Sequence, residues 1–385
     1  MSIERCFNVA DFRALAKRKL PAPMFHYIDG GSDDEIALRR STEAYADYEL
    51  MPRFLVDVSK IDTKTKVLGT TLDWPVFLSP TGMSRLFHHE KEPAVARAAA
   101  NAGTLYSLST LGTTSIEDVA KASAGPKMFQ IYILKDRSLT EEFVARCKAA
   151  KFTAICLTVD APMSGNRERD FVHGMTMPPK FGLADLASFA TRFSWSFHFM
   201  RDPDFRLANV VHKVDALGGG TMPLMEYMNS QFDRTVTWKD VEWLRSKWDG
   251  PLLIKGLQSP EDARNAVKSG VSGIMISNHG GRQLETAPAP LDCIAPMRDA
   301  VGDALELICD GGIRRGTHVV KALALGANAC SIGRGYLYSL AAGGQKGVER
   351  QLKLLRTEVE RAMVLMGAAK ISEIDRSFLI ERRRR

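Results

Sequence analysis

Eight short apolar runs, separated by segments with helical periodicity, constrain the fold of this chain more than any other feature. The runs begin near Pro75, Thr104, Lys127, Thr153, Pro251, Gly273, Leu305 and Asn328. Each is nearly continuous in apolar residues, which is typical of strands buried on both faces. Helical patterns such as Glu92–Ala102 and Pro260–Lys268 lie between the runs, and glycines follow several of them where C-terminal caps belong. Eight strands alternating with helices predict an α/β fold, the closed parallel (β/α)8 or TIM barrel.

The spacing of the runs predicts how the rest of the chain is arranged around this barrel. An open doubly wound sheet is the rival fold, and the lack of a GxGxxG motif after the first run weakens it. The fourth and fifth runs are about 100 residues apart, far more than a strand-plus-helix repeat, so a large insertion is expected after the fourth strand. We therefore expect a single domain over 1–385, with an N-terminal helical lid (1–70), a barrel (71–164 and 236–370) and an insertion (165–235).

Composition restricts the class of protein and its partners. The chain is 45% hydrophobic and 25% charged, which is ordinary for a globular protein, and its net charge of +7 favours anionic partners. The basic residues are spread along the chain, and no nucleic-acid-binding motif is present, so no nucleic-acid partner is expected. The six cysteines form no CxxC pair and are interpreted as buried apolar residues in a reducing compartment. The charged N-terminus is not typical of a signal peptide, and no apolar run is long enough to span a bilayer.

Polar residues end most of the apolar runs, and in a barrel of this kind the chemistry lies at the carboxyl ends of the strands. Loops are exposed to solvent and usually polar, which explains any one such residue. It explains less well a Lys, a His and an Asp placed directly after very apolar strands. These are Lys255, His279 and Asp310. The loops after the seventh and eighth runs, 310–316 and 333–335, combine glycines with arginines. That composition and position predict a phosphate site.

The segment SNHGGRQLE at 277–285 is the most specific signal in the sequence. His279 can take up a proton near neutral pH, and Arg282 can hold a carboxylate through two hydrogen bonds. The two glycines between them allow the backbone to approach a flat ligand closely.

At this segment the chain resembles the FMN-dependent L-2-hydroxy acid dehydrogenase/oxidase family. Within that family it most resembles the membrane L-lactate dehydrogenases. The resemblance extends from about Phe7 to Ser377 and includes the motifs HYIDGG, SPTG, SLST, FQIY, LTVD, IKG, DGGIRRG and IGRG. It implies FMN as the cofactor, a small L-2-hydroxy acid as the substrate and no metal.

The resemblance also implies a role for each matching residue. It makes His279 the catalytic base, Asp160 the carboxylate that supports it, and Tyr132 a further catalytic and substrate contact. Substrate binding falls to Tyr27, Tyr132, Arg167 and Arg282. Flavin binding falls to Pro80, Thr81, Gly82, Ser109, Gln130, Thr158, Lys255 and Ser277, and ribityl-phosphate binding to Asp310, Gly311, Gly312, Arg314, Gly333 and Arg334.

Three features bear on the subtype. Gly82 stands where oxidases of the family commonly have Ala, and Leu111 where glycolate oxidase has a bulky Trp, which favours a dehydrogenase acting on lactate or a larger acid. Residues 181–200 contain six aromatic residues beside basic ones, a composition that suits either a membrane interface or a lid packed on the barrel. The resemblance favours the membrane, because membrane-associated members carry their membrane segment in this loop. It further implies a quinone or similar electron acceptor, a location on the cytoplasmic side of an inner membrane, and a homotetramer.

Besides a non-catalytic, membrane-bound flavin-binding protein, two other readings remain open. One is a hydrogen-peroxide-forming 2-hydroxy acid oxidase on the same scaffold. The other, from a different class, is a Schiff-base aldolase that uses Lys255 as its nucleophile and the two glycine loops to hold a sugar phosphate. His88 and His89 are interpreted as solvated residues, because Glu90 is not expected to share their direction.

Overall fold

The computed structural model describes residues 2–176, 179–203, 205–211 and 230–382. Eight parallel strands form a closed barrel in the order β4 to β11, with β11 paired to β4. The barrel strands are β4 (Val76–Thr81), β5 (Tyr106–Ser109), β6 (Lys127–Ile131), β7 (Ala154–Thr158), β8 (Leu252–Lys255), β9 (Gly273–Ser277), β10 (Glu306–Asp310) and β11 (Ala329–Ile332). Each strand begins within a few residues of the start of a predicted apolar run. The predicted closed (β/α)8 barrel is confirmed.

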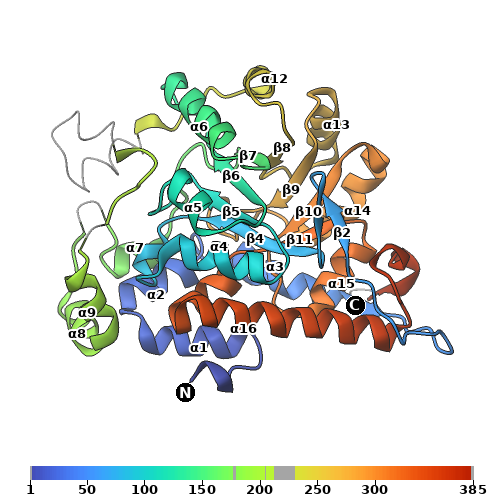
Figure 1. The fold of residues 1–385 in the computed structure, drawn as a ribbon, viewed down its shortest axis with the longest axis horizontal. Helices are drawn as coiled ribbons and strands as arrows, with labels where there is room; N and C mark the ends of the chain where they lie inside the picture. The colour runs from blue at the N-terminus through green and yellow to red at the C-terminus, as the bar shows by residue number, and fades with distance from the viewer. Residues whose placement is uncertain (1, 177–178, 204, 212–229, 383–385) are drawn as a thin grey trace.

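Helices surround the barrel, and α1 and α16 run together beneath it in Figure 1. The helices that follow the strands are α4 (Lys91–Asn101), α5 (Ile116–Ala122), α6 (Arg137–Ala149), α12 (Trp238–Lys247), α13 (Pro260–Lys268), α14 (Pro290–Val301), α15 (Gly316–Ala324) and α16 (Arg334–Met366). Gly103, Gly270 and Gly326 have positive φ angles directly after α4, α13 and α15, as expected of C-terminal caps. All six cysteines are buried and free, as the sequence predicted.

The N-terminal segment covers both ends of the barrel. Its helices are α1 (Val9–Lys19), α2 (Ala22–Asp29) and α3 (Ile36–Glu43). The loop between α2 and α3 meets the carboxyl ends of the strands, where Ser32 N donates to Gly281 O over 2.9 Å. The hairpin of β2 (Thr65–Val67) and β3 (Thr70–Leu72) buries Val67, Leu68 and Leu72 in an apolar cluster with barrel residues such as Phe77 and Met275. The same cluster contains Ala154 and Ala329, the first residues of β7 and β11, so the hairpin closes the opposite end of the barrel.

The insertion after β7 carries short helices on the outside of the barrel. They are α7 (Glu168–Val172), α8 (Leu183–Thr191) and α9 (Phe193–Arg201), and α8 and α9 form the lower left corner of Figure 1. A small sheet of β1 (Tyr48–Leu50) and β12 (Leu379–Glu381) joins the N-terminal segment to the C-terminal end. The remaining short elements are 3-10 helices: η1 (Ile3–Arg5), η2 (Ala44–Asp47), η3 (Ser84–Leu86), η4 (Gly302–Ala304), η5 (Ile371–Glu373) and η6 (Arg376–Phe378).

Asp29 at the end of α2 fastens the N-terminal helices to the barrel. Its carboxylate accepts hydrogen bonds from Arg13 of α1, Arg169 of α7 and Tyr338 of α16, the last over 2.8 Å. Burial by itself would raise the pKa of Asp29, but the hydrogen bonds from Arg13 and Tyr338 lower it to about 2. One carboxylate therefore holds three distant segments of the chain together.

We expect Asp29→Asn to lower the free energy of unfolding by about 2 kcal/mol at pH 6, because it weakens the buried acceptor of hydrogen bonds from Tyr338 and from two arginines that are partly exposed to solvent. The pKa of Asp29 is lower in the folded protein than its usual 3.8. Its contribution is therefore present above about pH 4 and is lost as the pH falls toward about 2. Urea unfolding should show that the difference in free energy of unfolding between wild type and variant becomes smaller as the pH is lowered from 6 to 3. A difference that stays constant with pH would contradict this role. An equal loss of stability in the exposed control Asp34→Asn would contradict it as well.

Candidate active site

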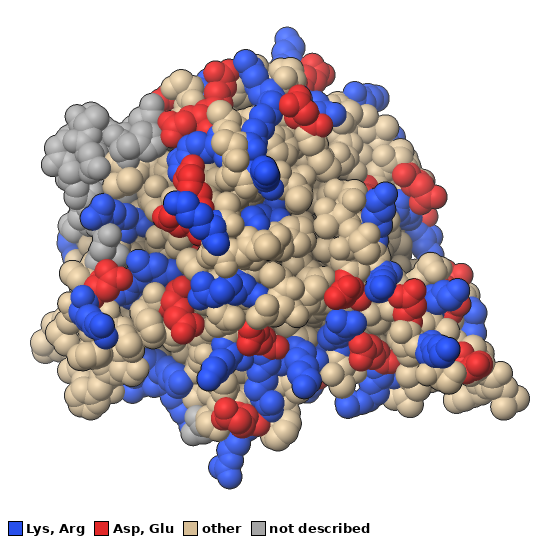
Figure 2. All heavy atoms as spheres, viewed as in Figure 1, with Lys and Arg blue, Asp and Glu red and all other residues tan. Residues whose placement is uncertain are grey.

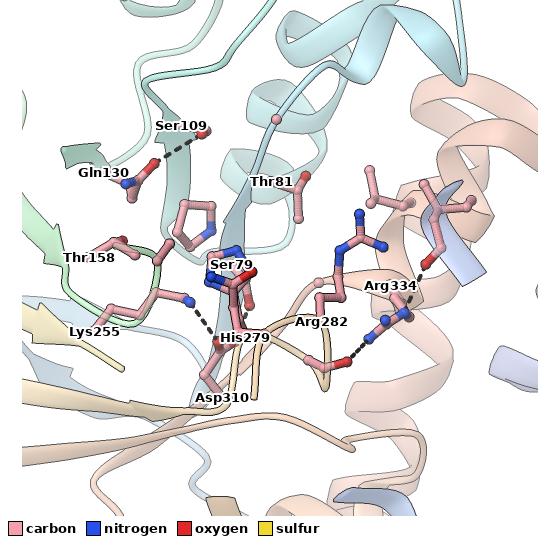
Figure 3. A pocket seen from close by; sticks show the side chains of 18 of the residues that line it. Ser79, Thr81, Ser109, Gln130, Thr158, Lys255, His279, Arg282, Asp310 and Arg334 are labelled. Carbon is pink, nitrogen blue, oxygen red and sulfur yellow. Dashed lines mark hydrogen bonds and ion pairs between the residues drawn. The ribbon is translucent and has the colours of Figure 1, made fainter. Parts of the chain in front are cut away.

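A cavity opens at the carboxyl ends of the barrel strands, where the polar residues that end the apolar runs come together (Figure 3). The predicted site residues that line it are Tyr27, Pro80, Thr81, Gly82, Ser109, Gln130, Tyr132, Thr158, Arg167, Lys255, His279, Arg282, Asp310, Gly311, Gly312, Arg314, Gly333 and Arg334. Asp160 and Ser277 are not among the described lining residues. Both lie behind the wall, where Asp160 contacts His279 and Ser277 contacts Asp310. The sequence predicted both as site residues. In the structure they support residues of the wall from behind.

His279 and Asp160 form a hydrogen-bonded pair. His279 Nδ1 lies 2.8 Å from Asp160 Oδ1, and the other carboxylate oxygen lies 3.6 Å from Lys255 Nζ. Burial by itself would raise the pKa of Asp160, but the charges of Lys255 and His279 lower it to about 2. Burial, followed by the charge of Lys255, lowers the pKa of His279 below 6.5. At neutral pH the pair is therefore an ionised carboxylate and a neutral imidazole. The Nδ1 proton points to Asp160, and Nε2 is free to accept a proton.

Lys255 stands between two carboxylates. Its Nζ lies 3.6 Å from Asp160 and 3.8 Å from Asp310, an ion pair drawn in Figure 3. Burial by itself would lower the pKa of Lys255, but Asp160 and Asp310 raise it above 10.5. Lys255 is therefore a fixed positive charge at the wall of the cavity. A Schiff-base nucleophile needs a neutral amine at this position, so the aldolase reading is disfavoured.

Asp310 gathers three serine hydroxyls from different strands. Ser79, Ser277 and Ser331 each donate to its carboxylate over 2.6 to 2.7 Å. Ser277 also accepts a hydrogen bond from the backbone N–H of His279 over 3.0 Å. Asp310 thus connects β4, β9 and β11 and, through Ser277, fixes the backbone that carries His279.

Two arginines and an aromatic ring form the other wall. The guanidinium of Arg282 lies over the ring of Tyr27, 4.9 Å from its centroid, and that of Arg167 lies 5.8 Å from the same ring. Arg282 also donates to the backbone carbonyls of Tyr27 and Gly30, which fixes its direction. Burial and the neighbouring charge of Arg167 lower the pKa of Arg282. Two like charges side by side favour an anion between them, and a carboxylate fits the paired donors.

Two glycine motifs that are far apart in sequence meet at this site. A Cβ on Gly31 would lie 2.7 Å from Gly281 O, and a Cβ on Gly281 would lie 2.4 Å from Leu38 N. Only glycine permits that approach, and Gly281 also has a positive φ of 70°. His279 itself has a φ of 55°, an uncommon conformation for a residue with a side chain. The turn that presents His279 is therefore held by direct packing against the segment between α2 and α3.

The cavity fits the FMN that the sequence resemblance implies. The side-chain atoms Gln130 Nε2 and Thr158 Oγ1 are buried without a hydrogen-bond partner among the described residues, so each could bond a polar ring edge. Gly311 and Gly312 have positive φ angles and line the end of the cavity together with Arg314. Backbone N–H groups of glycines beside an arginine suit a phosphate. Arg334 already donates to the carbonyls of Ile28, Gly30 and Gly280, so it also fixes the surrounding loops.

Comparison with known proteins establishes the family. Residues 16–381 match the family model described as FMN-dependent dehydrogenase. The chain belongs to the FMN-dependent dehydrogenase family. It is 40% identical to glycolate oxidase 1 of Zea mays over 97% of this chain and 95% of that protein. It is also 40% identical to the L-lactate dehydrogenase of Pseudomonas aeruginosa, over 96% of this chain and 97% of that protein.

A solved structure of the monotopic membrane protein (S)-mandelate dehydrogenase superposes with a TM-score of 0.94 at 34% identity, covering 98% of this chain and all of that one. Mandelate oxidase with (S)-4-hydroxymandelic acid superposes with a TM-score of 0.85, also at 34% identity, covering 97% of this chain and 98% of that one. Membership of the FMN-dependent dehydrogenase family makes this protein an FMN-dependent enzyme that oxidises a 2-hydroxy acid, as the sequence resemblance indicated.

Sequence reasoning missed some residues that shape the cavity. Ser331 lies in β11 two residues before Gly333, which directly follows the strand, and this spacing of two is a signal that could have found it. Phe232 closes one side by packing edge-on against Tyr132, with ring centroids 5.0 Å apart. It lies in the insertion, where no periodic pattern pointed to it.

The interpretation of His88 and His89 needs one correction. Potential ligand atoms of His88, His89 and Glu90 all lie within 4.8 Å of one another, so the expectation that Glu90 faces elsewhere is wrong. Adjacent residues reach one point here because they lie in the loop between η3 and α4, where side chains do not alternate as in a strand. The two histidine rings are stacked, with centroids 4.3 Å apart.

Proposed function

We propose that this enzyme is an L-2-hydroxy acid dehydrogenase that oxidises L-lactate to its 2-keto acid and passes the electrons to a quinone or a similar acceptor. One observation carries this proposal. His279, which is hydrogen-bonded to Asp160 behind it, lines the same cavity as Arg282 and Arg167, so one small molecule can meet a base and a carboxylate anchor together.

The geometry of each group supports the role that we propose for it. Arg282 and Arg167, steadied by Tyr27, bind the substrate carboxylate and orient the carbon that bears the hydroxyl group. His279 accepts the hydroxyl proton at Nε2, and Asp160 stabilises the imidazolium that forms. Tyr132 contacts the substrate near its hydroxyl group as a neutral phenol, since burial raises its pKa. Bound FMN supplies the two-electron acceptor.

The proposed cofactor contacts use the remaining cavity residues. Pro80, Thr81, Gly82, Ser109, Gln130 and Thr158 would hold the flavin ring, and Lys255 would place its charge beside it. Asp310, Gly311, Gly312, Arg314, Gly333 and Arg334 would hold the ribityl phosphate, with Ser277 acting on Asp310 from behind. A lysine held positive by two carboxylates stabilises negative charge that develops on a neighbouring ring.

The walls above this site support a substrate with a small apolar side chain. A Cβ on Gly82 would lie only 3.0 Å from the Cβ of Leu111, so these two residues limit the same space. Met83, Phe87 and Phe232 supply the other apolar surfaces. The methyl group of lactate would bury against them, and one such methyl group contributes about 1–3 kcal/mol to discrimination.

A substrate panel tests this proposal. With a dye as electron acceptor and air excluded, kcat/KM should be highest for L-lactate, about tenfold or more above glycolate, which lacks the methyl group. D-lactate should be inert, because its hydroxyl group would point away from His279. A higher kcat/KM with glycolate or (S)-mandelate would reject lactate as the substrate while leaving the reaction class intact.

The peroxide-forming oxidase is a second candidate, because the chain is as similar to a glycolate oxidase as to an L-lactate dehydrogenase. The two functions differ in the reaction of the reduced enzyme with oxygen. Reduced protein mixed with air should reoxidise far more slowly than it reacts with a quinone analogue. Fast reoxidation with formation of hydrogen peroxide would favour the oxidase.

We further propose a peripheral contact between α8–α9 and the cytoplasmic side of an inner membrane, and a homotetramer. No helix among the described residues is long and apolar enough to cross a membrane. The aromatic residues of 181–200 are divided between two environments. Phe181, Phe189 and Trp195 pack against the core, whereas Phe193 and Phe197 are 81% and 56% exposed. The exposed apolar side chains Leu183, Leu186 and Met200 extend this surface. Light scattering of the purified protein tests the tetramer.

A further inference from the structure

A second cavity lies away from the active site, between the end of α1, the η3–α4 segment and α9. Its volume of 360 Å³ far exceeds the 10–15 Å³ or so that a single water needs. Four permanently charged side chains line it: Arg18, Lys19, Arg85 and Arg192. His88, His89 and His198 complete the polar wall, and none of the described lining residues is Asp or Glu.

The arrangement of these groups favours an anion over a metal ion. The rings of His89 and His198 are stacked with centroids 3.7 Å apart and 14° between their planes, as are those of His88 and His89 at 4.3 Å. A metal at this stack would need Glu90 beside His88 and His89, whose potential ligand atoms lie within 4.8 Å of one another, but Glu90 does not line the cavity. His88 Nδ1 already accepts a hydrogen bond from the backbone N–H of Glu90 over 3.2 Å. The four cations thus dominate the field in the cavity.

The cavity is physically joined to the exposed apolar surface of α8–α9. Phe193 lines the cavity and is also 81% exposed. Arg85 lines it and donates to the carbonyls of His198 and Asp202, which holds α9 in place. The Arg192 guanidinium, between α8 and α9, donates to Leu20 O at the end of α1 over 3.2 Å. The corner formed by α8 and α9 presents mostly uncharged surface in Figure 2.

We propose that this cavity binds the phosphate group of an anionic phospholipid whose acyl chains lie against the apolar side chains of α8 and α9. A basic pocket beside an apolar helical surface matches the two parts of such a lipid, an anionic head and a hydrocarbon tail. This inference rests on the proposed membrane contact and adds a defined headgroup site to it.

The experiment compares two charge-matched double variants in co-sedimentation with vesicles. Arg18→Gln with Arg192→Gln removes two cavity charges, and Lys180→Gln with Arg201→Gln removes two exposed charges next to α8 and α9 that do not line the cavity. With vesicles of phosphatidylcholine and phosphatidylglycerol, the cavity variant should bind about tenfold more weakly than the control variant, since it loses hydrogen-bonded phosphate contacts as well as charge. Equal losses in both variants would reduce the effect to general surface charge and overturn the headgroup site.

Two further arms identify the ligand. In vesicles whose negative charge comes from oleate instead of phosphatidylglycerol, the difference between the two double variants should disappear. Inorganic phosphate alone should show no saturable binding in calorimetry. Saturable phosphate binding, with vesicle binding that is unaffected by the cavity variant, would make this a site for a free anion and overturn the lipid assignment.

A third variant separates failure of the cavity from failure of the membrane contact. Phe193→Asp with Phe197→Asp should abolish vesicle binding if α8–α9 meets the membrane. If this variant loses binding and the cavity variant does not, only the headgroup site is wrong. If it binds as wild type does, the membrane contact is wrong as well. Unfolding temperature and dye-linked hydroxy acid oxidation should be unchanged in every variant, which verifies that each one is folded.

Discussion

Replacing His279 by Gln is expected to lower kcat about 10³–10⁴-fold while the protein still binds FMN. Gln keeps polar atoms near Asp160 but cannot accept the substrate proton. Stopped-flow mixing with L-lactate under nitrogen measures the rate at which the flavin absorbance bleaches. The wild-type rate should also fall in acid with a midpoint below 6.5, because burial and Lys255 lower the pKa of His279 and the protonated ring cannot act as a base.

A matched control comes from another histidine of the chain. His173 Nδ1 lies 3.0 Å from Asp185 Oδ1, a similar pair that does not line the active-site cavity. His173→Gln should therefore bleach at a rate within about twofold of wild type. Near-normal turnover in His279→Gln, or an equal loss in His173→Gln, would remove His279 from its proposed role as the base.

Replacing Arg282 by Met is expected to lower kcat/KM about 10²–10³-fold, with a higher KM and a lower kcat. The guanidinium lies over Tyr27 and donates to the carbonyls of Tyr27 and Gly30, so its remaining donors face the cavity in a fixed direction. Losing it removes both the binding of the carboxylate and the alignment of the substrate with His279.

Arg282→Lys provides the comparison that identifies the cause. Lys retains the charge but offers a single donor group in place of the planar fork, so it should recover only part of the loss. Full recovery would mean that charge alone matters. An unchanged KM in Arg282→Met would show that the substrate carboxylate is bound elsewhere, and Arg315→Met, in an exposed pair with Glu358, should behave as wild type.

Most of the barrel could be predicted because its strands are buried on both faces. Such strands are nearly continuous apolar runs in the sequence, and a polar residue is found where most of the strands leave the barrel, as with Lys255 and Asp310. The parallel arrangement then brings those ends to one side, so most of the predicted site residues line one cavity. The insertion carries no such signal. Its aromatic residues look alike in sequence, yet Trp195 packs inward and donates to Leu86 O, whereas Phe193 is exposed.

The sequence by itself determined the barrel, the family resemblance and the groups that we propose act on a 2-hydroxy acid, because these depend on residue type and on local periodicity. Only the tertiary structure decided which groups touch. It placed Asp160 behind His279, brought Lys255 between two carboxylates, and packed the glycines of HYIDGG against those of NHGGR. It also gathered Arg18, Arg85 and Arg192 around one cavity. Those contacts join residues that are distant in sequence, so their distances and pKa shifts depend on packing that no local pattern records.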